Sequence, residues 1–236
     1  MALGIYLSRD LSICHSGLIS VSCAFCPVTF REYRSDCMNL DNPDQLIELF
    51  DELFISRCNT RLDYCQSEGH QEPIYLPADN HQPKHRILFA HGFFASALHE
   101  ISHWCIAGQQ RRLLVDFGYW YEPDGRSAEK QREFEQVEVK PQAIEWILTK
   151  ACGRKFNIST DNLDGDAEEI AEGRELFANN VLLQVKKYLQ NGLPERAGIL
   201  KQALLDYYQV NKELTVDHFQ LRELVDVPEL PKTATV

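Results

Sequence analysis

The sequence lacks the patterns that would place it in a specialised class of protein. Its 236 residues contain no internal repeat, no run of one charge and no glycine-rich phosphate loop. They also lack a cysteine set for an iron–sulfur cluster, so the sequence reveals no electron source. Basic residues are scarce, with 24 Lys and Arg against 35 Asp and Glu and a net charge of −11. Because an acidic chain repels phosphate backbones, we expect no nucleic acid partner.

Disulfide scaffolds are also disfavoured. Four of the eight cysteines lie in the first 37 residues, and the others are scattered without paired spacing. A secreted disulfide framework would be denser, so we expect reduced thiols and a cytoplasmic protein. Cys23 and Cys26 form an isolated C-x-x-C. Structural zinc would need two more ligands at matching spacing, and none follows.

Residues 11–30 carry no charge, but they do not match a targeting or membrane segment. Serines and His15 interrupt the apolar positions, and Arg9 is followed at once by Asp10. A signal peptide needs a basic start and an unbroken apolar core, and a membrane span needs about 20 predominantly apolar residues. We therefore expect neither export nor a membrane partner. We interpret residues 1–38 as an N-terminal extension without an assigned role, either disordered or an artefact of start-codon choice.

The rest of the chain, residues 39–236, predicts an α+β domain that is mostly helical and has a small sheet. The spacing of apolar residues predicts five helices. The first begins at Pro43, and the others cover 93–107, about 127–150, 167–190 and 195–209. Pro141 should kink the third helix or mark its boundary. Strands are expected at 74–76 and 86–90, a β-like segment at 113–121, turns over 58–72 and a loose tail after Val225.

The strongest chemical signal is an H-E-x-x-H motif, His99-Glu100-Ile101-Ser102-His103. Residues four apart share one face of a helix, so both imidazoles can bind a single metal ion. Glu100 lies about 100° round the helix from His99, where its carboxylate can handle protons beside the open side of the metal. The alternative is a buried helix whose histidines are satisfied by ordinary hydrogen bonds.

A third ligand must come from a separate element, and the expected helix after residue 127 offers two carboxylates. Glu138 stands between Val137 and Val139, and a carboxylate in an apolar stretch is costly unless it is paired or bound to metal. Glu135 lies three residues earlier on roughly the same face and could be a ligand or a hydrogen-bond acceptor. We prefer Glu138 because of its apolar flanks.

Two histidines and one carboxylate suit Zn(II) for hydrolysis or Fe(II) for oxygen chemistry, and spacing does not distinguish the two metals. A zinc metallopeptidase would use Glu100 as the general base. A binding module with a structural metal would need a closed site of four ligands. Cys105 and His91 lie nearby in sequence, but neither is an obvious fourth ligand.

Several longer segments resemble the elongation factor P hydroxylase family, in order and from about Leu40 to about Phe219. They are EPIYLPAD (72–79), FAHG (89–92), ASALHEISHWCIAG (95–108), VDFGYWY (115–121), VEVKPQA (137–143), DNL (161–163) and NGLPER (191–196). This resemblance is far more specific than the five-residue motif. Residues 1–37 have no counterpart in it.

The resemblance implies a non-haem iron enzyme that uses O2 to hydroxylate the β-lysylated lysine of elongation factor P. It implies that His99, His103 and Glu138 hold Fe(II) in a metal-dependent catalytic domain over 39–236. It also implies a core like that of H-E-x-x-H metalloproteases rather than the barrel usual for iron oxygenases. The sequence specifies no oligomeric state.

Aromatic residues near the motif could line a pocket for a cationic side chain through cation–π contacts. They are Trp104, Tyr119, Trp120 and Tyr121. For each of them alone, an ordinary core position is the stronger interpretation. The triplet Asp116-Phe117-Gly118 is that of kinases, but no glycine loop or catalytic loop accompanies it, so we give it no kinase role.

Overall fold

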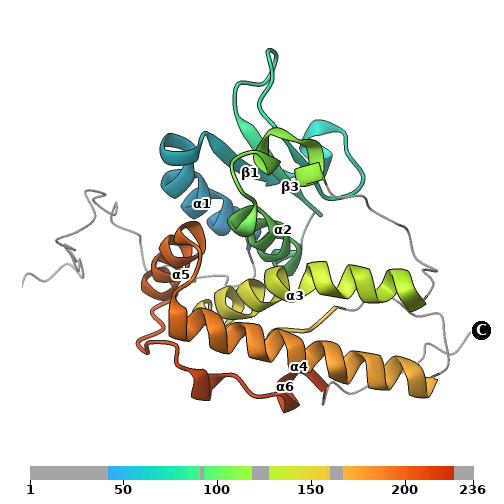
Figure 1. Cartoon of the computed structure of the whole chain (residues 1–236). Coiled ribbons are helices and arrows are strands. Elements are labelled where there is room, and N and C mark those ends of the chain that lie inside the picture. Colours follow the sequence, from blue (N-terminus) through green and yellow to red (C-terminus); the bar gives the residue numbers. More distant parts are fainter. Residues whose placement is uncertain (1–41, 91–92, 119–127, 160–166, 226–236) are drawn as a thin grey trace, which may run out of the picture. The chain divides into compact units, whose positions relative to one another are not determined.

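The computed structural model describes residues 42–90, 93–118, 128–159 and 167–225 (Figure 1). The chain divides into two units, 1–40 and 41–236, and all described residues belong to the second. The expected N-terminal extension and the tail after Val225 therefore lie outside the described residues. The α-helices of the described part are α1 (Pro43–Cys58), α2 (Phe94–Ile106), α3 (Ala128–Ala151), α4 (Ala167–Asn191), α5 (Glu195–Tyr207) and α6 (Arg222–Val225). The strands are β1 (Thr60–Tyr64), β2 (Ile74–Leu76) and β3 (His85–Phe89), and the 3-10 turns are η1 (Cys65–Glu68), η2 (Arg111–Leu113), η3 (Val115–Gly118) and η4 (Val216–His218).

The small sheet has the order β1–β3–β2, with β3 in the centre. β1 pairs with β3 in parallel, with Leu62 opposite Ile87, and β2 pairs with β3 in antiparallel fashion. β3 is almost entirely buried, with Ile87 and Leu88 at 1% and 0% exposure, because α1 and α2 pack against the sheet. The expectation of a mostly helical α+β domain with a small sheet is confirmed.

Local sequence signals explain where α1 begins and ends. Asn42 accepts a hydrogen bond from the amide of Asp44 at 3.0 Å, and Pro43 occupies the first turn, where its missing N–H is not needed. At the other end Asn59 adopts a left-handed conformation, with φ of 51°, and its N–H bonds to the carbonyl of Ile55 at 3.1 Å. The chain then enters β1 directly.

Two expectations about short segments were wrong. Thr60–Tyr64 is strand β1 rather than part of a turn region. The sequence pattern did not indicate this strand, because only Thr60 and Leu62 are fully buried and polar residues alternate with them. The described part of 113–121 forms 3-10 turns instead of a β-like segment. Asp116 and Phe117 have φ of 46° and 57°, which prevents an extended strand.

The expected helix at about 127–150 is confirmed as α3, which continues through Pro141, so of the two alternatives for this proline the helix boundary is excluded. Pro141 is buried, as are most residues that follow it in the helix. α3 packs against α2, α4 and α5, which places it between the motif helix and the C-terminal helices (Figure 1). The buried positions after Pro141 therefore face neighbouring helices.

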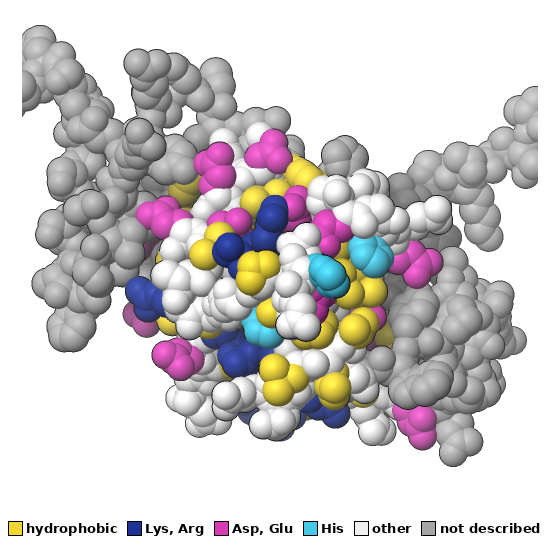
Figure 2. Space-filling model, turned by 90° about the horizontal axis from the view of Figure 1, so that it is seen from above, with side chains coloured by type: hydrophobic (Ala, Val, Ile, Leu, Met, Phe, Trp, Pro, Cys, Tyr) yellow, Lys and Arg dark blue, Asp and Glu magenta, His cyan; other side chains and the backbone are white. Residues whose placement is uncertain are grey.

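No described helix is both long and apolar enough to cross a membrane. On the face shown in Figure 2, acidic, basic and apolar side chains of the described part are interspersed.

Candidate metal centre

Helix α2 carries the two motif histidines on one face, as the spacing predicts. The Nε2 atoms of His99 and His103 lie 3.2 Å apart. The opposite side of α2 is anchored in the core through Leu98, Ile101 and Trp104, each at most 1% exposed. The helix is therefore held by apolar packing while its imidazoles face α3.

Helix α3 brings Glu138 to the same point. Its Oε1 lies 3.2 Å from Nε2 of His103, and its Oε2 lies 3.8 Å from Nε2 of His99. The Glu138 side chain is only 6% exposed, so water does not solvate this carboxylate freely. Among the described residues, one group has the composition and spacing of a metal site, and it consists of His99, His103 and Glu138.

The geometry of this group fits a first-row transition metal. One ligand atom from each residue lies within 4.8 Å of the others. Atoms bound to a common ion at about 2.0–2.2 Å lie about 3.0–3.5 Å apart, so small side-chain shifts would complete the site. Two imidazoles and one carboxylate form the donor set of non-haem Fe(II) oxygenases and also suit Zn(II).

Two further residues of α3 extend the site away from the ligand atoms. Glu145 Oε2 lies 2.9 Å from His99 Nδ1. Gln142 approaches Glu138 Oε2 at 3.5 Å and is fixed by Ser159, donating to its carbonyl at 2.7 Å and accepting from its amide at 3.2 Å. Glu138, Gln142 and Glu145 follow one another at helical spacing, so one face of α3 carries the whole set.

The buried carboxylates change the acid–base properties of His99 and Glu138. Burial disfavours charged His99, but the hydrogen bond and charge of Glu145, together with Glu138 and Glu100, outweigh it and raise the pKa of His99 to about 10. Burial would raise the pKa of Glu138, but the charges of His103 and His99 and the hydrogen bond with His103 hold it below its usual value. The cluster therefore favours an ion pair, which a metal ion would replace.

Glu100 lies beside the ligand set with its carboxyl group mostly desolvated. Burial raises its pKa, and the charges of Asp116 and Glu138 add to that rise, although His99 and His103 oppose it. Asp116 is held by the amide of Tyr75, which donates to its Oδ1 at 2.7 Å. The structure thus gives Asp116 of the kinase-like triplet a structural bond to β2.

The alternative ligand Glu135 lies outside the group. It is half-buried and accepts a hydrogen bond from Gln131 one turn earlier in α3, at 3.1 Å. The apolar flanks that favoured Glu138 are only partly buried, because Val137 is 39% exposed whereas Val139 packs against the core. Adjacent helical residues point about 100° apart, so apolar neighbours say little about the burial of the residue between them.

Glu145 was not predicted from the sequence as part of the site. A usable signal was present, since Glu145 lies within an apolar run of α3, two helical turns after Glu138. A buried carboxylate in register with a candidate ligand is a candidate partner for that site.

The other candidates near the motif have structural roles or lie outside the described residues. Trp104 is fully buried, with Arg196 over its ring at 4.7 Å, so its cation–π partner is internal. Burial raises the pKa of Cys105 to about 12, which leaves it a poor source of a thiolate ligand. His91 and the three aromatic residues 119–121 lie outside the described residues.

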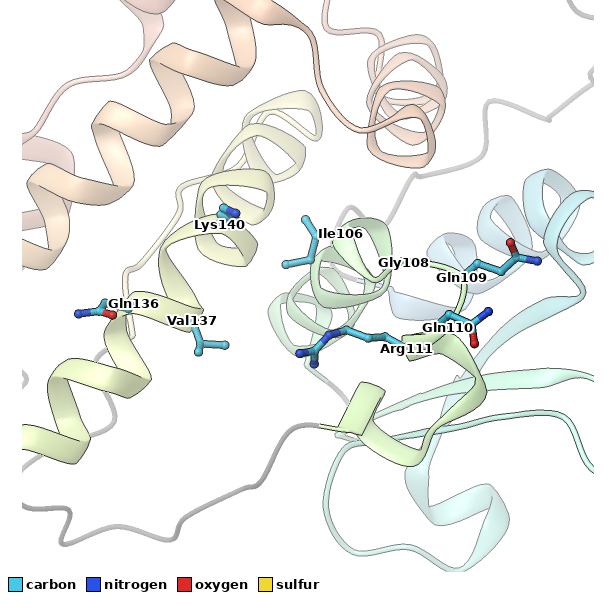
Figure 3. A pocket seen from close by; sticks show the side chains of 8 residues that line it. All are labelled: Ile106, Gly108, Gln109, Gln110, Arg111, Gln136, Val137 and Lys140. Carbon is cyan, nitrogen blue, oxygen red and sulfur yellow. The ribbon is translucent and has the colours of Figure 1, made fainter.

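A pocket of about 590 Å³ lies between the C-terminal end of α2 and the first half of α3 (Figure 3). Arg111 extends into it towards Val137, and Lys140 also lines it. These two cationic side chains would repel an ammonium group placed in this pocket. None of the three candidate ligands and no atom of Glu100 lines it.

Comparisons with a family model and with a curated relative agree with each other. A family model described as elongation factor P hydroxylase matches residues 49–219. A relative from Haemophilus influenzae, named elongation factor P lysine hydroxylase, is 48% identical over 178 residues. That alignment covers 75% of this chain and 96% of the relative, and it supports no peptidase function.

Proposed function

This chain belongs to the elongation factor P hydroxylase family, and from that premise we propose that it is an iron-dependent hydroxylase of the β-lysylated lysine of elongation factor P. The family makes it a lysine-hydroxylating enzyme. The observation that supports the finer proposal is the meeting of His99, His103 and Glu138, from two separate helices, at distances suited to one metal ion.

Iron and O2 follow from the chemistry of the reaction. Hydroxylation of a C–H bond needs a metal that binds O2 and changes its valence, which Zn(II) does not do. Bound by His99, His103 and Glu138, Fe(II) would supply that oxygen activation, and three protein ligands leave positions open for it. The donor set on α2 and α3 is thus one that suits this chemistry.

Glu100 is proposed to hold and move a proton beside the metal. Its carboxyl group adjoins His99 in α2, and burial raises its pKa towards the range in which a group both accepts and releases protons. It is not part of the ligand group. Its removal should therefore impair turnover more than metal binding.

The charge of the site favours a cationic substrate. Glu100 and Asp116 add carboxyl groups near His103, and the chain as a whole has a net charge of −11. A lysine that carries a further β-lysyl group brings two ammonium groups, which such a field attracts. The same field supports the proposal that nucleic acid is not a partner.

Further proposals concern the location of the enzyme in the cell and the kind of core on which it is built. We place the enzyme in the cytoplasm, where its proposed translation-factor substrate is made. We also propose a core related to that of H-E-x-x-H metalloproteases, because α2 with its motif packs against both the small sheet and a second helix that supplies a ligand. We also propose that residues 1–38 are an N-terminal extension outside the catalytic domain of residues 39–236.

The direct test incubates Fe(II)-loaded protein with β-lysylated elongation factor P, O2 and a reductant. Mass spectrometry of the modified peptide should show a gain of about 16 Da, one oxygen atom. His99→Ala and Glu138→Ala should abolish the gain, whereas Glu135→Ala, on the same helix but outside the ligand group, should retain it. No gain from folded, iron-loaded protein with any of several reductants would refute the proposal, and peptide cleavage by the zinc form would replace it with a hydrolase.

A further inference from the structure

Glu145 is a buried carboxylate that lies in short contact with the outer nitrogen of a candidate metal ligand. Its Oε2 lies 2.9 Å from Nδ1 of His99, and its side chain is 9% exposed. A carboxylate in such an environment is costly unless it is paired. The pairing with His99 therefore accounts for a charge inside the apolar second half of α3.

The contact determines which nitrogen of His99 can face a metal. When Nδ1–H donates to Glu145, the neutral ring has its lone pair on Nε2. Nε2 is the atom that faces His103, at 3.2 Å, and Glu138, at 3.8 Å. The hydrogen bond thus fixes both the tautomer and the orientation of the ring.

Glu145 contacts the side of the His99 ring that faces away from the ligand group, so it is not placed to be a ligand itself. It contacts Nδ1, whereas the ligand group meets at Nε2, and Glu145 is not a member of that group. Glu145 also lines a separate pocket of about 300 Å³, together with Phe94, Leu98, Thr149, Arg154 and Lys155. Its contact with the metal centre is the one with Nδ1 of His99, so any effect on the metal is exerted through His99.

We propose that Glu145 is a positioning residue that holds His99 in its metal-binding tautomer and increases the metal affinity of the centre. This inference rests on the metal centre of the proposed function. A carboxylate that accepts the ring N–H of a ligand histidine also makes that ligand more basic, and loss of such a partner typically weakens metal binding about 10–100-fold.

Zinc binding by the full chain tests the proposal without relying on turnover. Zn(II) affinity is measured by competition with a chelator for wild type, Glu145→Ala, Glu145→Gln, Glu135→Ala and His99→Ala. We expect Glu145→Ala to lose about 10–100-fold in affinity. Glu145→Gln should lose less, because its amide oxygen still accepts from Nδ1–H, and Glu135→Ala should match wild type.

Long-range ¹H–¹⁵N spectra of the zinc-loaded protein give a second readout. Wild type and Glu145→Gln should show His99 with a proton on Nδ1 and the metal on Nε2, and Glu145→Ala should lose this single pattern. A merely structural Glu145 would lower the midpoint of thermal unfolding and leave both the zinc affinity and the tautomer of the folded variant unchanged, and that result would overturn the inference.

The His99→Ala arm separates this inference from the proposed function. If zinc affinity falls in His99→Ala but not in Glu145→Ala, the metal centre stands and the role of Glu145 is wrong. If His99→Ala binds zinc as tightly as wild type, the centre itself is wrong, and the inference fails with it.

Discussion

The guanidinium group of Arg196 lies over the indole ring of Trp104, 4.7 Å from its centroid. The same group donates to the backbone carbonyls of Trp104 and Ala107, both at 2.7 Å. These carbonyls belong to the C-terminal end of α2, where a helix leaves its last acceptors unpaired. A residue of α5 therefore caps the helix that carries both motif histidines.

Replacing Arg196 should destabilise the domain through this cap. Arg196→Met removes the charge-assisted hydrogen bonds and the cation–π contact, and we expect a loss of about 2–3 kcal/mol in the free energy of unfolding. Arg57→Met, at an exposed position in the last turn of α1, is the matched control and should change little. Urea denaturation of the metal-free variants measures both, and equal midpoints would contradict the capping role.

Two glycines should respond in opposite directions to alanine. Gly118 has φ of +72°, and a Cβ there would lie 2.7 Å from Cδ1 of Leu114, so Gly118→Ala should destabilise by about 1–3 kcal/mol. Gly198 lies within α5 with no atom within 4 Å of an added Cβ, so Gly198→Ala should stabilise by about 0.4–1 kcal/mol. The midpoint of thermal unfolding is measured for both variants and for wild type. A shift of the same sign in both variants would contradict this prediction.

The stability of the metal-free protein should depend on His99 and on pH. The pKa of His99 is about 10 in the folded chain against 6.5 for the ordinary group, so between these values the folded state holds a proton that the unfolded state has lost. This stabilising contribution is complete below pH 6.5 and disappears as pH rises through about 10. Urea unfolding across this window in the presence of a chelator should show the decline in wild type. A decline of the same size in His99→Gln would assign it to other groups.

Metal binding should show the opposite dependence on pH. A metal ion at Nε2 of His99 replaces a proton, so one proton is released for each ion bound at pH values below about 10. Zinc affinity should therefore rise by up to about tenfold per pH unit from neutral pH upward. Competition titrations at several pH values give the slope, and a flat profile would contradict the release of a proton from His99 on metal binding.

Glu100→Gln should separate turnover from metal binding. Because Glu100 is proposed to move a proton and lies outside the ligand group, the variant should keep its zinc affinity and lose about 10²–10⁴-fold in kcat. Glu52→Gln, on the exposed face of α1, is the matched control. A loss of zinc affinity as large as that of His99→Ala would instead make Glu100 a ligand.

The sequence predicted the helices better than it predicted the connections between them. Helical spacing of large apolar residues identified α1, α2, α4 and α5 to within a few residues, because each buries one face. Strand β1 was missed because its partner β3 lies more than twenty residues later and its polar residues, Arg61 and Asp63, dominate the local composition. Non-local pairing stabilises such a strand, and a local pattern does not record it.

The candidate site was only partly visible in the sequence for the same reason. The spacing of His99 and His103 is local, so one helix is enough to bring them together. Glu138 and Glu145 reach them through the packing of α2 against α3, and Asp116 through its bond to Tyr75 of β2. No interval in the sequence encodes these distances.

Within the described part of the chain, the ligand group comes from two helices, α2 and α3, and their alignment matters for refolding. A slip of α3 along α2 by one turn, about 5.4 Å, would bring an amide, that of Gln142, to the place of the Glu138 carboxylate. Helical signal in circular dichroism returns whenever either helix forms, aligned or not. Recovery of zinc binding should therefore be slower than recovery of the circular dichroism signal. Its rate measures how fast α2 and α3 reach their native alignment.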